Sequence, residues 1–400
     1  MPQGISELVR ACRTPSLRKC SLESTLEAAL PFARSAGLTR IADITGLDKI
    51  GIPVVTAIRP NAKSLSVSSG KGLTLGDAWV SGLMEAIELS CAESAEPSCR
   101  FSDLNGGVII PDPFDLPQVR GRVRPASLTP DVEMAIGYDL FTGKQAAVPY
   151  ELVHVACPPY WDKQGTGFLV SSNGLGAGND RAEAILQGLC EVVERDALAL
   201  CRAADPKGYL RHLEAIDLDT VPDPDCQHLV ARCRAANVHI SAFNITSDIG
   251  VPVYYCRLNN PTVTTLAAAD GTACHPSSAI ALRHAITEAI QTRLLLISGS
   301  RDDLQRKDYI SKPEFSQLQD PMLCFSAHRD GIFDTVESAT AWILRKLEES
   351  GFSLAICIEL QGPSRALSFV RIIVPRLEGS IHSALYSPGA RAKTCALSYS

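Results

Sequence analysis

Apolar and polar residues are spaced along the chain in patterns that predict both strands and helices. Strand-like runs occupy 40–44, 52–58, 132–140, 145–153, 168–172, 238–245, 251–258, 263–268, 352–359 and 369–374. Helical spacing occurs at 21–37, 77–92, 181–203, 227–236, 277–298 and 335–349, with Ser21 as the expected N-cap of the first helix. Because these elements interleave without strict alternation, we predict an α+β fold of mixed sheets packed against helices, rather than a doubly wound fold.

Three of the predicted helices repeat one arrangement of residues. A segment rich in Gly or Ser precedes each helix, an alanine stands seven residues before a central glutamate, and a second polar residue follows that glutamate at i+3. Since positions i and i+3 share a helix face, each helix presents two converging polar groups among apolar neighbours. These pairs are Glu85 and Glu88, Glu191 and Glu194, and Glu288 and Gln291.

The five carboxylates of these pairs indicate a cation site. Two glutamates on a buried helix repel each other and are costly to desolvate unless a multivalent cation or arginines meet them. Oxygen ligands without nearby cysteine favour Mg²⁺, and no histidine stands at i+3, as a di-iron carboxylate site would require. The alternative, solvated pairs on helix surfaces, is typical of a single helix but not of three copies with apolar flanks.

The Gly-rich segments are expected to be turns that enter the helices and offer backbone N–H groups to phosphate. Lys71, in Ser-Gly-Lys-Gly, adds a positive charge, although the spacing is not that of a Walker A loop. Arg195 and Arg293 follow the i+3 positions by one and two residues, where they could clamp phosphate oxygens. We therefore predict a nucleoside triphosphate site with several Mg²⁺ ions.

Composition excludes several other classes. The 38 basic and 44 acidic side chains give a net charge of −6 without runs of like charge, which argues against binding nucleic acid or a membrane surface. The chain shows neither a signal-peptide pattern nor an apolar stretch of about 18 residues, so a cytoplasmic location is expected. The 14 cysteines form no C-x-x-C pair that would indicate a zinc site.

The three acidic motifs, together with Ser69-Gly-Lys71-Gly and Ser171-Ser-Asn173-Gly174, resemble the ATP-binding motifs of the YcaO superfamily. The resemblance runs from about Leu17 to Arg391 and implies one YcaO domain over 38–400, to which segment 1–37 contributes. It also implies a non-Walker ATP-binding fold in which Mg-ATP phosphorylates a backbone amide oxygen of a peptide substrate, and a homodimeric assembly.

Roles follow from the resemblance residue by residue. It implies that Mg²⁺ is held by Glu85, Glu88, Glu191, Glu194 and Glu288. It implies that ATP is contacted by Lys71, Ser81, Asn173, Gln187, Arg195, Gln291 and Arg293. A shorter N-terminal match, which also covers Glu23, adds Arg18 to these ATP contacts. No catalytic residue is assigned, and His154, His212 and Cys190 are expected to be structural.

The resemblance leaves the product open. Thr45-Gly-Leu-Asp48 and Pro388-Gly-Ala-Arg391 look like YcaO proteins that form backbone thioamides with a TfuA-type sulfur-delivery partner. The alternatives are an azoline-forming cyclodehydratase and an accessory factor for methylthiolation of ribosomal protein S12. A further hypothesis is a non-catalytic scaffold that binds ATP, but the intact acidic positions disfavour it. Another is a lyase or transferase that acts on a diphosphate. The usual all-helical architecture of such enzymes conflicts with the predicted strands.

Overall fold

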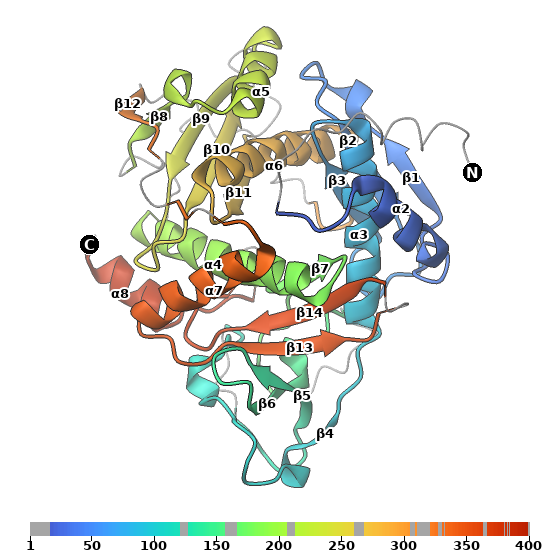
Figure 1. Cartoon of the computed structure of the whole chain (residues 1–400), viewed down its shortest axis with the longest axis vertical. Coiled ribbons are helices and arrows are strands. Elements are labelled where there is room, and N and C mark those ends of the chain that lie inside the picture. Colours follow the sequence, from blue (N-terminus) through green and yellow to red (C-terminus); the bar gives the residue numbers. More distant parts are fainter. Residues whose placement is uncertain are drawn as a thin grey trace. The chain divides into compact units, whose positions relative to one another are not determined.

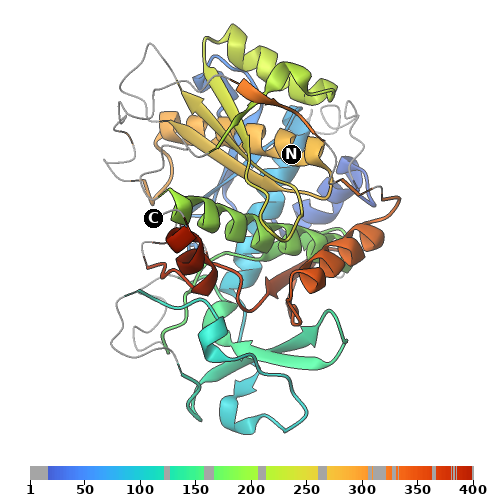
Figure 2. The same ribbon diagram turned by 90° about the vertical axis from the view of Figure 1, so that its left-hand side faces the viewer.

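The computed structural model confirms an α+β architecture (Figures 1 and 2). It describes residues 17–120, 127–156, 166–205, 213–259, 268–304, 309, 321–326, 330–331, 333–362, 366–379, 381, 383 and 385–398. The chain divides into two compact units that interleave along the sequence. The first unit comprises 1–87, 207–246 and 250–332, and the second comprises 88–206, 247–249 and 333–400.

The first unit contains two sheets. Strands β1 (Arg40–Asp43), β2 (Val54–Ile58) and β3 (Val67–Lys71) form an antiparallel sheet. The second sheet has the order β11-β10-β9-β8-β12, with β8 (Ala215–Asp217), β9 (His239–Asn244), β10 (Val253–Asn259), β11 (Ala269–Cys274) and β12 (Pro321–Cys324). In this sheet only the pairing of β12 with β8 is parallel among the described strands.

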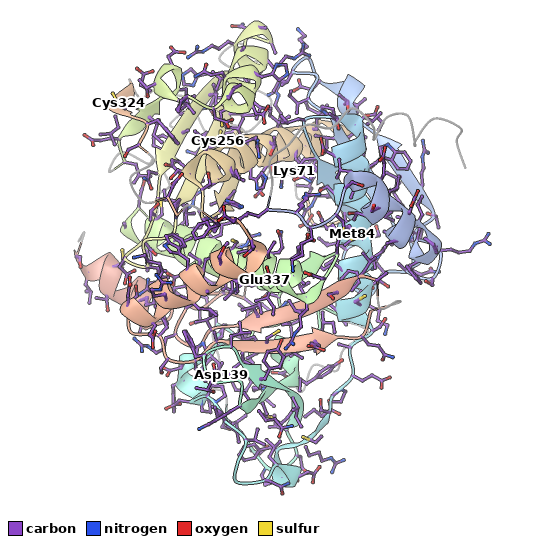
Figure 3. The ribbon with its side chains drawn as sticks, viewed as in Figure 1. Lys71, Met84, Asp139, Cys256, Cys324 and Glu337 are labelled. Carbon is purple, nitrogen blue, oxygen red and sulfur yellow. The ribbon has the colours of Figure 1, made fainter. Side chains whose placement is uncertain are left out.

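Helices complete the core of the first unit. It holds α2 (Leu22–Ala29), most of α3 (Leu75–Glu93), α5 (Pro224–Ala235) and α6 (Ser278–Ser298). Helices α5 and α6 contact each other, and α6 lies along β10 and β11 (Figure 2). Apolar side chains from both helices and from the five-stranded sheet form one cluster, which includes the fully buried thiol of Cys256 (Figure 3).

The second unit is built on one antiparallel sheet. Its strand order is β4-β5-β13-β14-β7, with β6 paired to β5: β4 (Cys99–Arg100), β5 (Glu133–Asp139), β6 (Gln145–Pro149), β7 (Leu175–Gly178), β13 (Ile356–Leu360) and β14 (Ser368–Ile373). Helix α4 (Arg181–Ala204) packs on β7 and β14 and is itself contacted by α7 (Val336–Glu349) and α8 (Ala390–Ser398). The buried carboxylate of Asp139 (Figure 3) accepts two backbone N–H bonds in the turn between β5 and β6.

Several expectations about elements were wrong in detail. The first helix ends at Ala29, and Leu30–Phe32 forms a 3₁₀ turn containing Pro31, which lacks the N–H needed to continue an α-helix. Instead of a strand at 168–172, the structure has a single bridge between Phe168 and Gln118. The strand expected at 263–268 falls almost entirely outside the described residues, and helix α8 was not predicted.

The other predicted elements lie close to their expected ranges, whereas β3, β4, β7, β8, β11 and β12 were not predicted as strands. Ser21 caps α2 through its Oγ, which accepts the N–H of Ser24 at 3.2 Å. The boundary expected between residues 37 and 38 stays a prediction, although α2 and β1, on its two sides, both belong to the first unit. Of the helices that the structure describes, none is both long enough and apolar enough to cross a lipid bilayer.

Candidate functional site

Each of the three predicted acidic motifs lies on a helix that follows a glycine-containing strand. The pairs are β3–α3, β7–α4 and β11–α6. In every pair the strand glycine approaches the helix so closely that an added Cβ would collide with a backbone oxygen. That Cβ would lie 2.1 Å from Ala78 O at Gly70, 2.1 Å from Ala184 O at Gly176 and 2.3 Å from Ala285 O at Gly271. The sequence repeat is therefore a structural repeat.

These contacts correct the prediction that the Gly-rich segments are turns entering the helices. The structure places Ser69, Gly70 and Lys71 in β3, and Gly271 in β11. Glycine is required there because strand and helix backbones touch, not because a loop cradles phosphate. Asn173 does lie in a turn, directly before β7.

In the first unit, Lys71 connects β3 to α6 (Figure 3). Its Nζ donates to Glu288 Oε2 at 3.0 Å and to Gln291 Oε1 at 3.1 Å. The amide of Gln291 in turn donates to Ser69 Oγ at 2.7 Å. The structure thus brings together three of the predicted ligand residues from segments more than 200 positions apart.

Glu85 belongs to the same unit and is half-buried. Its Oε1 lies 3.5 Å from the backbone nitrogen of Ser69. Burial raises the pKa of Glu85 to about 7, although attraction to Lys71 lowers it. A carboxylate with a raised pKa in a site that already holds Lys71 would be stabilised as an anion by further positive charge.

Arg293 and Arg18 differ in their surroundings. The guanidinium of Arg293 forms a bidentate, buried ion pair with Asp48, with N–O distances of 2.8 and 3.1 Å. Arg18 is exposed and is one of the cations that lower the pKa of His284 on α6, after the larger effect of desolvation. Arg18 therefore lies in the electrostatic neighbourhood of the helix that carries Glu288.

In the second unit, α4 presents Glu191, Glu194 and Arg195 together. Arg195 Nε lies 4.0 Å from Glu191 Oε1, and its Nη1 lies 3.6 Å from Glu194 Oε1. Gln187 precedes Glu191 by four residues and is exposed, which puts it on the same side of the helix. Ser81 precedes Glu85 on α3 by the same spacing.

Sequence reasoning missed Arg371, on β14. Its side chain is 2% exposed, and Nε and Nη1 have no hydrogen-bond partner. Burial lowers its pKa to about 10, and attraction to Glu191 and Glu88 offsets only part of this effect. Asn173 Oδ1 is likewise buried without a partner, and both residues line a cavity of about 30 Å³. The signal in the sequence was one arginine inside an otherwise apolar strand.

The residues expected to be structural are buried where the structure describes them. Cys190 is 9% exposed, and His154 is 1% exposed, with burial lowering its pKa to about 4. His212 lies outside the described residues.

The donor set fits Mg²⁺ with a phosphate ligand. Within the described part of the chain, no three Asp, Glu, His or Cys side chains already converge on one metal position. Mg²⁺ typically takes one or two carboxylates and completes its octahedron with water and phosphate oxygens. A buried guanidinium with unpaired N–H groups beside Glu191 and Glu88 is a site that an anion would satisfy.

A family model described as YcaO cyclodehydratase, ATP- and Mg²⁺-binding, matches residues 69–378. The chain belongs to the YcaO family. Members bind ATP and Mg²⁺, and YcaO domains are ATP-dependent enzymes that modify peptide backbones. The match includes every predicted site residue of this chain except those of the short N-terminal match, Arg18 and Glu23.

A curated relative and two solved structures extend the likeness over nearly the whole chain. A Rhizobium leguminosarum bv. trifolii protein, known only as encoded in the region 3′ of tfuA, is 31% identical over 409 residues, covering 97% of this chain and 93% of the relative. YcaO from Methanopyrus kandleri, solved with AMPPCP and Mg²⁺, superposes with a TM-score of 0.71 at 22% identity over 93% of this chain and 95% of that one. A heterocyclase solved with substrate and cofactor gives 0.72 at 21% identity; the match covers 93% of this chain but only 55% of the heterocyclase.

Proposed function

We propose that this YcaO protein activates a backbone amide of a peptide by ATP-dependent O-phosphorylation, and that the activated amide becomes a thioamide with sulfur from a TfuA-type partner. The observation that carries the phosphate site is Arg371, a buried cation with unpaired N–H groups beside Glu191 and Glu88. Support for the thioamide product comes from the Rhizobium relative, whose gene lies beside tfuA and whose sequence aligns along nearly its full length.

The chemistry explains why ATP is needed. An amide oxygen is a poor leaving group, whereas phosphate is a good one. When bound, Mg-ATP supplies the phosphoryl group that the amide oxygen accepts, and the sulfur nucleophile then attacks the carbon as inorganic phosphate leaves. Charge develops on phosphoryl oxygens during transfer, so cations held in place beforehand lower the barrier.

Each unit contributes residues to these tasks in the proposal. Mg²⁺ is held by the carboxylates of Glu85, Glu88, Glu191, Glu194 and Glu288. In the first unit Lys71, held by Glu288 and Gln291, contacts phosphate, with Ser81 and Arg18 as nucleotide contacts. In the second unit the proposed nucleotide contacts are Asn173, Gln187, Arg195 and the newly identified Arg371. The ion pair with Asp48 makes Arg293 a fixed charge that holds the segment between β1 and β2 against α6.

A second candidate product is an azoline, formed when a neighbouring Cys, Ser or Thr side chain attacks the activated amide. The structural likeness to a heterocyclase supports the azoline as a candidate product. The third candidate, an accessory role in methylthiolation of ribosomal protein S12, would involve ATP binding without peptide turnover by this chain. Homodimerisation and a cytoplasmic location remain predictions.

The first experiment measures Mg-ATP binding by calorimetry for the wild type, Glu191→Ala and the control Glu348→Ala, whose carboxylate is exposed on α7. We expect saturable, Mg²⁺-dependent binding that Glu191→Ala abolishes and Glu348→Ala retains. Unchanged affinity in Glu191→Ala would refute the site. Mass spectrometry of peptides incubated with ATP, the TfuA-type partner and sulfide then distinguishes exchange of oxygen for sulfur from loss of water.

A further inference from the structure

Helix α4 carries a buried carboxylate directly behind its acidic motif. Asp196 follows Glu194 by two residues, which turns its side chain to the opposite side of the helix. The side chain of Asp196 is fully buried, at 0% exposure. The carboxylate therefore faces the interior of the second unit, away from the side that carries the motif.

Arg391, at the start of α8, neutralises this carboxylate with a bidentate ion pair. Its Nε lies 2.9 Å from Asp196 Oδ1, and its Nη2 lies 2.8 Å from Asp196 Oδ2. The same guanidinium also binds the carboxylate of Asp248, with Nη1 and Nη2 at 3.0 and 2.5 Å. One arginine thus joins three segments of the second unit that are distant in sequence.

Glu378 fixes the beginning of α8 and also touches Asp196. Its carboxylate, on a side chain 3% exposed, accepts the N–H groups of Gly389 and Ala392 at 2.8 Å each and the hydroxyl of Tyr386 at 2.6 Å. Its own backbone N–H donates to Asp196 Oδ1 at 3.0 Å. A carboxylate at a helix N-terminus also interacts favourably with the helix dipole. We call Asp196, Asp248, Glu378 and Arg391 the C-terminal clamp.

The clamp and a glycine contact enclose the acidic motif along α4. On one side of the motif, Gly188 packs so tightly that an added Cβ would lie 2.6 Å from Ile372 on β14. On the other side stands Asp196. Glu191 and Glu194 lie between these two fixed points, so the position of their carboxylates depends on both.

We propose that the C-terminal clamp positions Glu191 and Glu194 for Mg-ATP, and that Asp196 and Arg391 are positioning residues rather than parts of the fold alone. This inference rests on the proposed role of these glutamates as Mg²⁺ ligands. Residues that orient metal ligands without touching the metal commonly change metal affinity by about 10- to 100-fold when altered.

The test uses Arg391→Lys in the full-length protein. Lysine keeps the charge but cannot form the parallel bonds to Asp196 together with those to Asp248. The matched control is Arg181→Lys, because Arg181 forms an exposed ion pair with Glu359 in the same unit. Calorimetry of Mg-ATP at limiting and at excess Mg²⁺ is combined with thermal unfolding.

We expect Arg391→Lys to weaken Mg-ATP binding at limiting Mg²⁺ by about tenfold or more, excess Mg²⁺ to restore most of the affinity, and the control to match the wild type. Should Arg391→Lys fail to fold, Asp248→Asn removes only the outer carboxylate and is expected to act in the same direction. Unchanged affinity and Mg²⁺ dependence alongside a lowered unfolding temperature would overturn the proposal, because the clamp would then serve stability alone.

The Glu191→Ala variant distinguishes a failure of the clamp proposal from a failure of the proposed Mg-ATP site. Loss of binding in Glu191→Ala with normal binding in both clamp variants would refute the clamp but retain the site. Normal binding in Glu191→Ala would refute the site, and the clamp inference with it.

Discussion

Replacing Arg371 by methionine should stabilise the protein without ligand and weaken its binding of Mg-ATP. The shift of the Arg371 pKa from an ordinary value of 12.5 to about 10 corresponds to a cost of about 3 kcal/mol for keeping the charge inside the fold. Methionine has a similar length, packs flexibly and leaves no N–H group without a partner. Because replacing a buried charge by an apolar side chain is often stabilising, we expect a gain of about 1–3 kcal/mol in the free energy of unfolding.

Thermal unfolding of the protein without nucleotide tests the first half of this prediction. The gain should raise the unfolding temperature by about 2 °C or more. The control is Arg257→Met, since Arg257 is also buried, at 7% exposure, but is paired with Asp270 at 2.7 and 2.9 Å. Its removal breaks the ion pair with Asp270 and should lower the unfolding temperature.

Calorimetry tests the second half. If Arg371 meets phosphate, its loss should weaken Mg-ATP binding by at least about tenfold, since a hydrogen bond to a charged group contributes about 1.5–3 kcal/mol. A gain in stability together with a loss of Mg-ATP affinity would indicate that the charge of Arg371 serves ligand binding at the expense of stability. A variant that is less stable and binds Mg-ATP normally would show that Arg371 serves the fold, and the reasoning would fail.

Three further predictions concern stability. Gly176→Ala should cost about 1–3 kcal/mol or prevent folding, because the added Cβ would lie 2.1 Å from a backbone oxygen of α4, whereas Gly106→Ala, in open space, should leave the unfolding temperature unchanged. Asp48→Asn should cost about 3–5 kcal/mol by leaving Arg293 buried with an uncompensated charge, measured by denaturant unfolding. Because His154 has a pKa of about 4 when folded and 6.5 ordinarily, stability should fall by up to roughly 3 kcal/mol as pH decreases from 6.5 to 4, and His154→Gln should flatten that dependence.

Much of the fold was predictable because its elements are locally encoded. The helices that carry the motifs differ from their predicted ranges by at most two residues at either end. The hairpin of β5 and β6 and the strands β9, β10 and β14 also lie where apolar patterning placed them. In the first two pairs the repeated alanine is also the residue whose backbone oxygen meets the strand glycine, whereas in the third pair that residue is Ala285.

The glycines were predicted to matter, but for the wrong reason. A short segment with glycine beside serine has the same sequence pattern whether it forms a turn or a strand that packs against a helix. Only the structure shows that Gly70, Gly176 and Gly271 lie in strands against helix backbone atoms. Spacing along one chain carries no information about the distance between two backbones.

The Arg371 site and the clamp could not be predicted because their partners are far apart in sequence. Arg391 lies 195 positions from Asp196 and 143 from Asp248. Each member alone resembles an ordinary charged residue. A buried charged residue is costly, and that cost points to a functional or positioning role. Burial is known only once the fold is known.

The three strand–helix pairs share their carboxylates but differ in their cations, and the differences make sense as a division of tasks. Lys71 ends the strand of the first pair, Arg195 directly follows Glu194 in the second, and the third pair has Gln291 in place of a second glutamate. With Gln291 in that place, Lys71 pairs with Glu288 and has an amide acceptor at 3.1 Å that adds no negative charge. A second carboxylate there would hold Lys71 more tightly and reduce its attraction for phosphate. In the proposed site, the repeat would therefore supply ligands for metal, and the departures from the repeat would supply charge for the nucleotide.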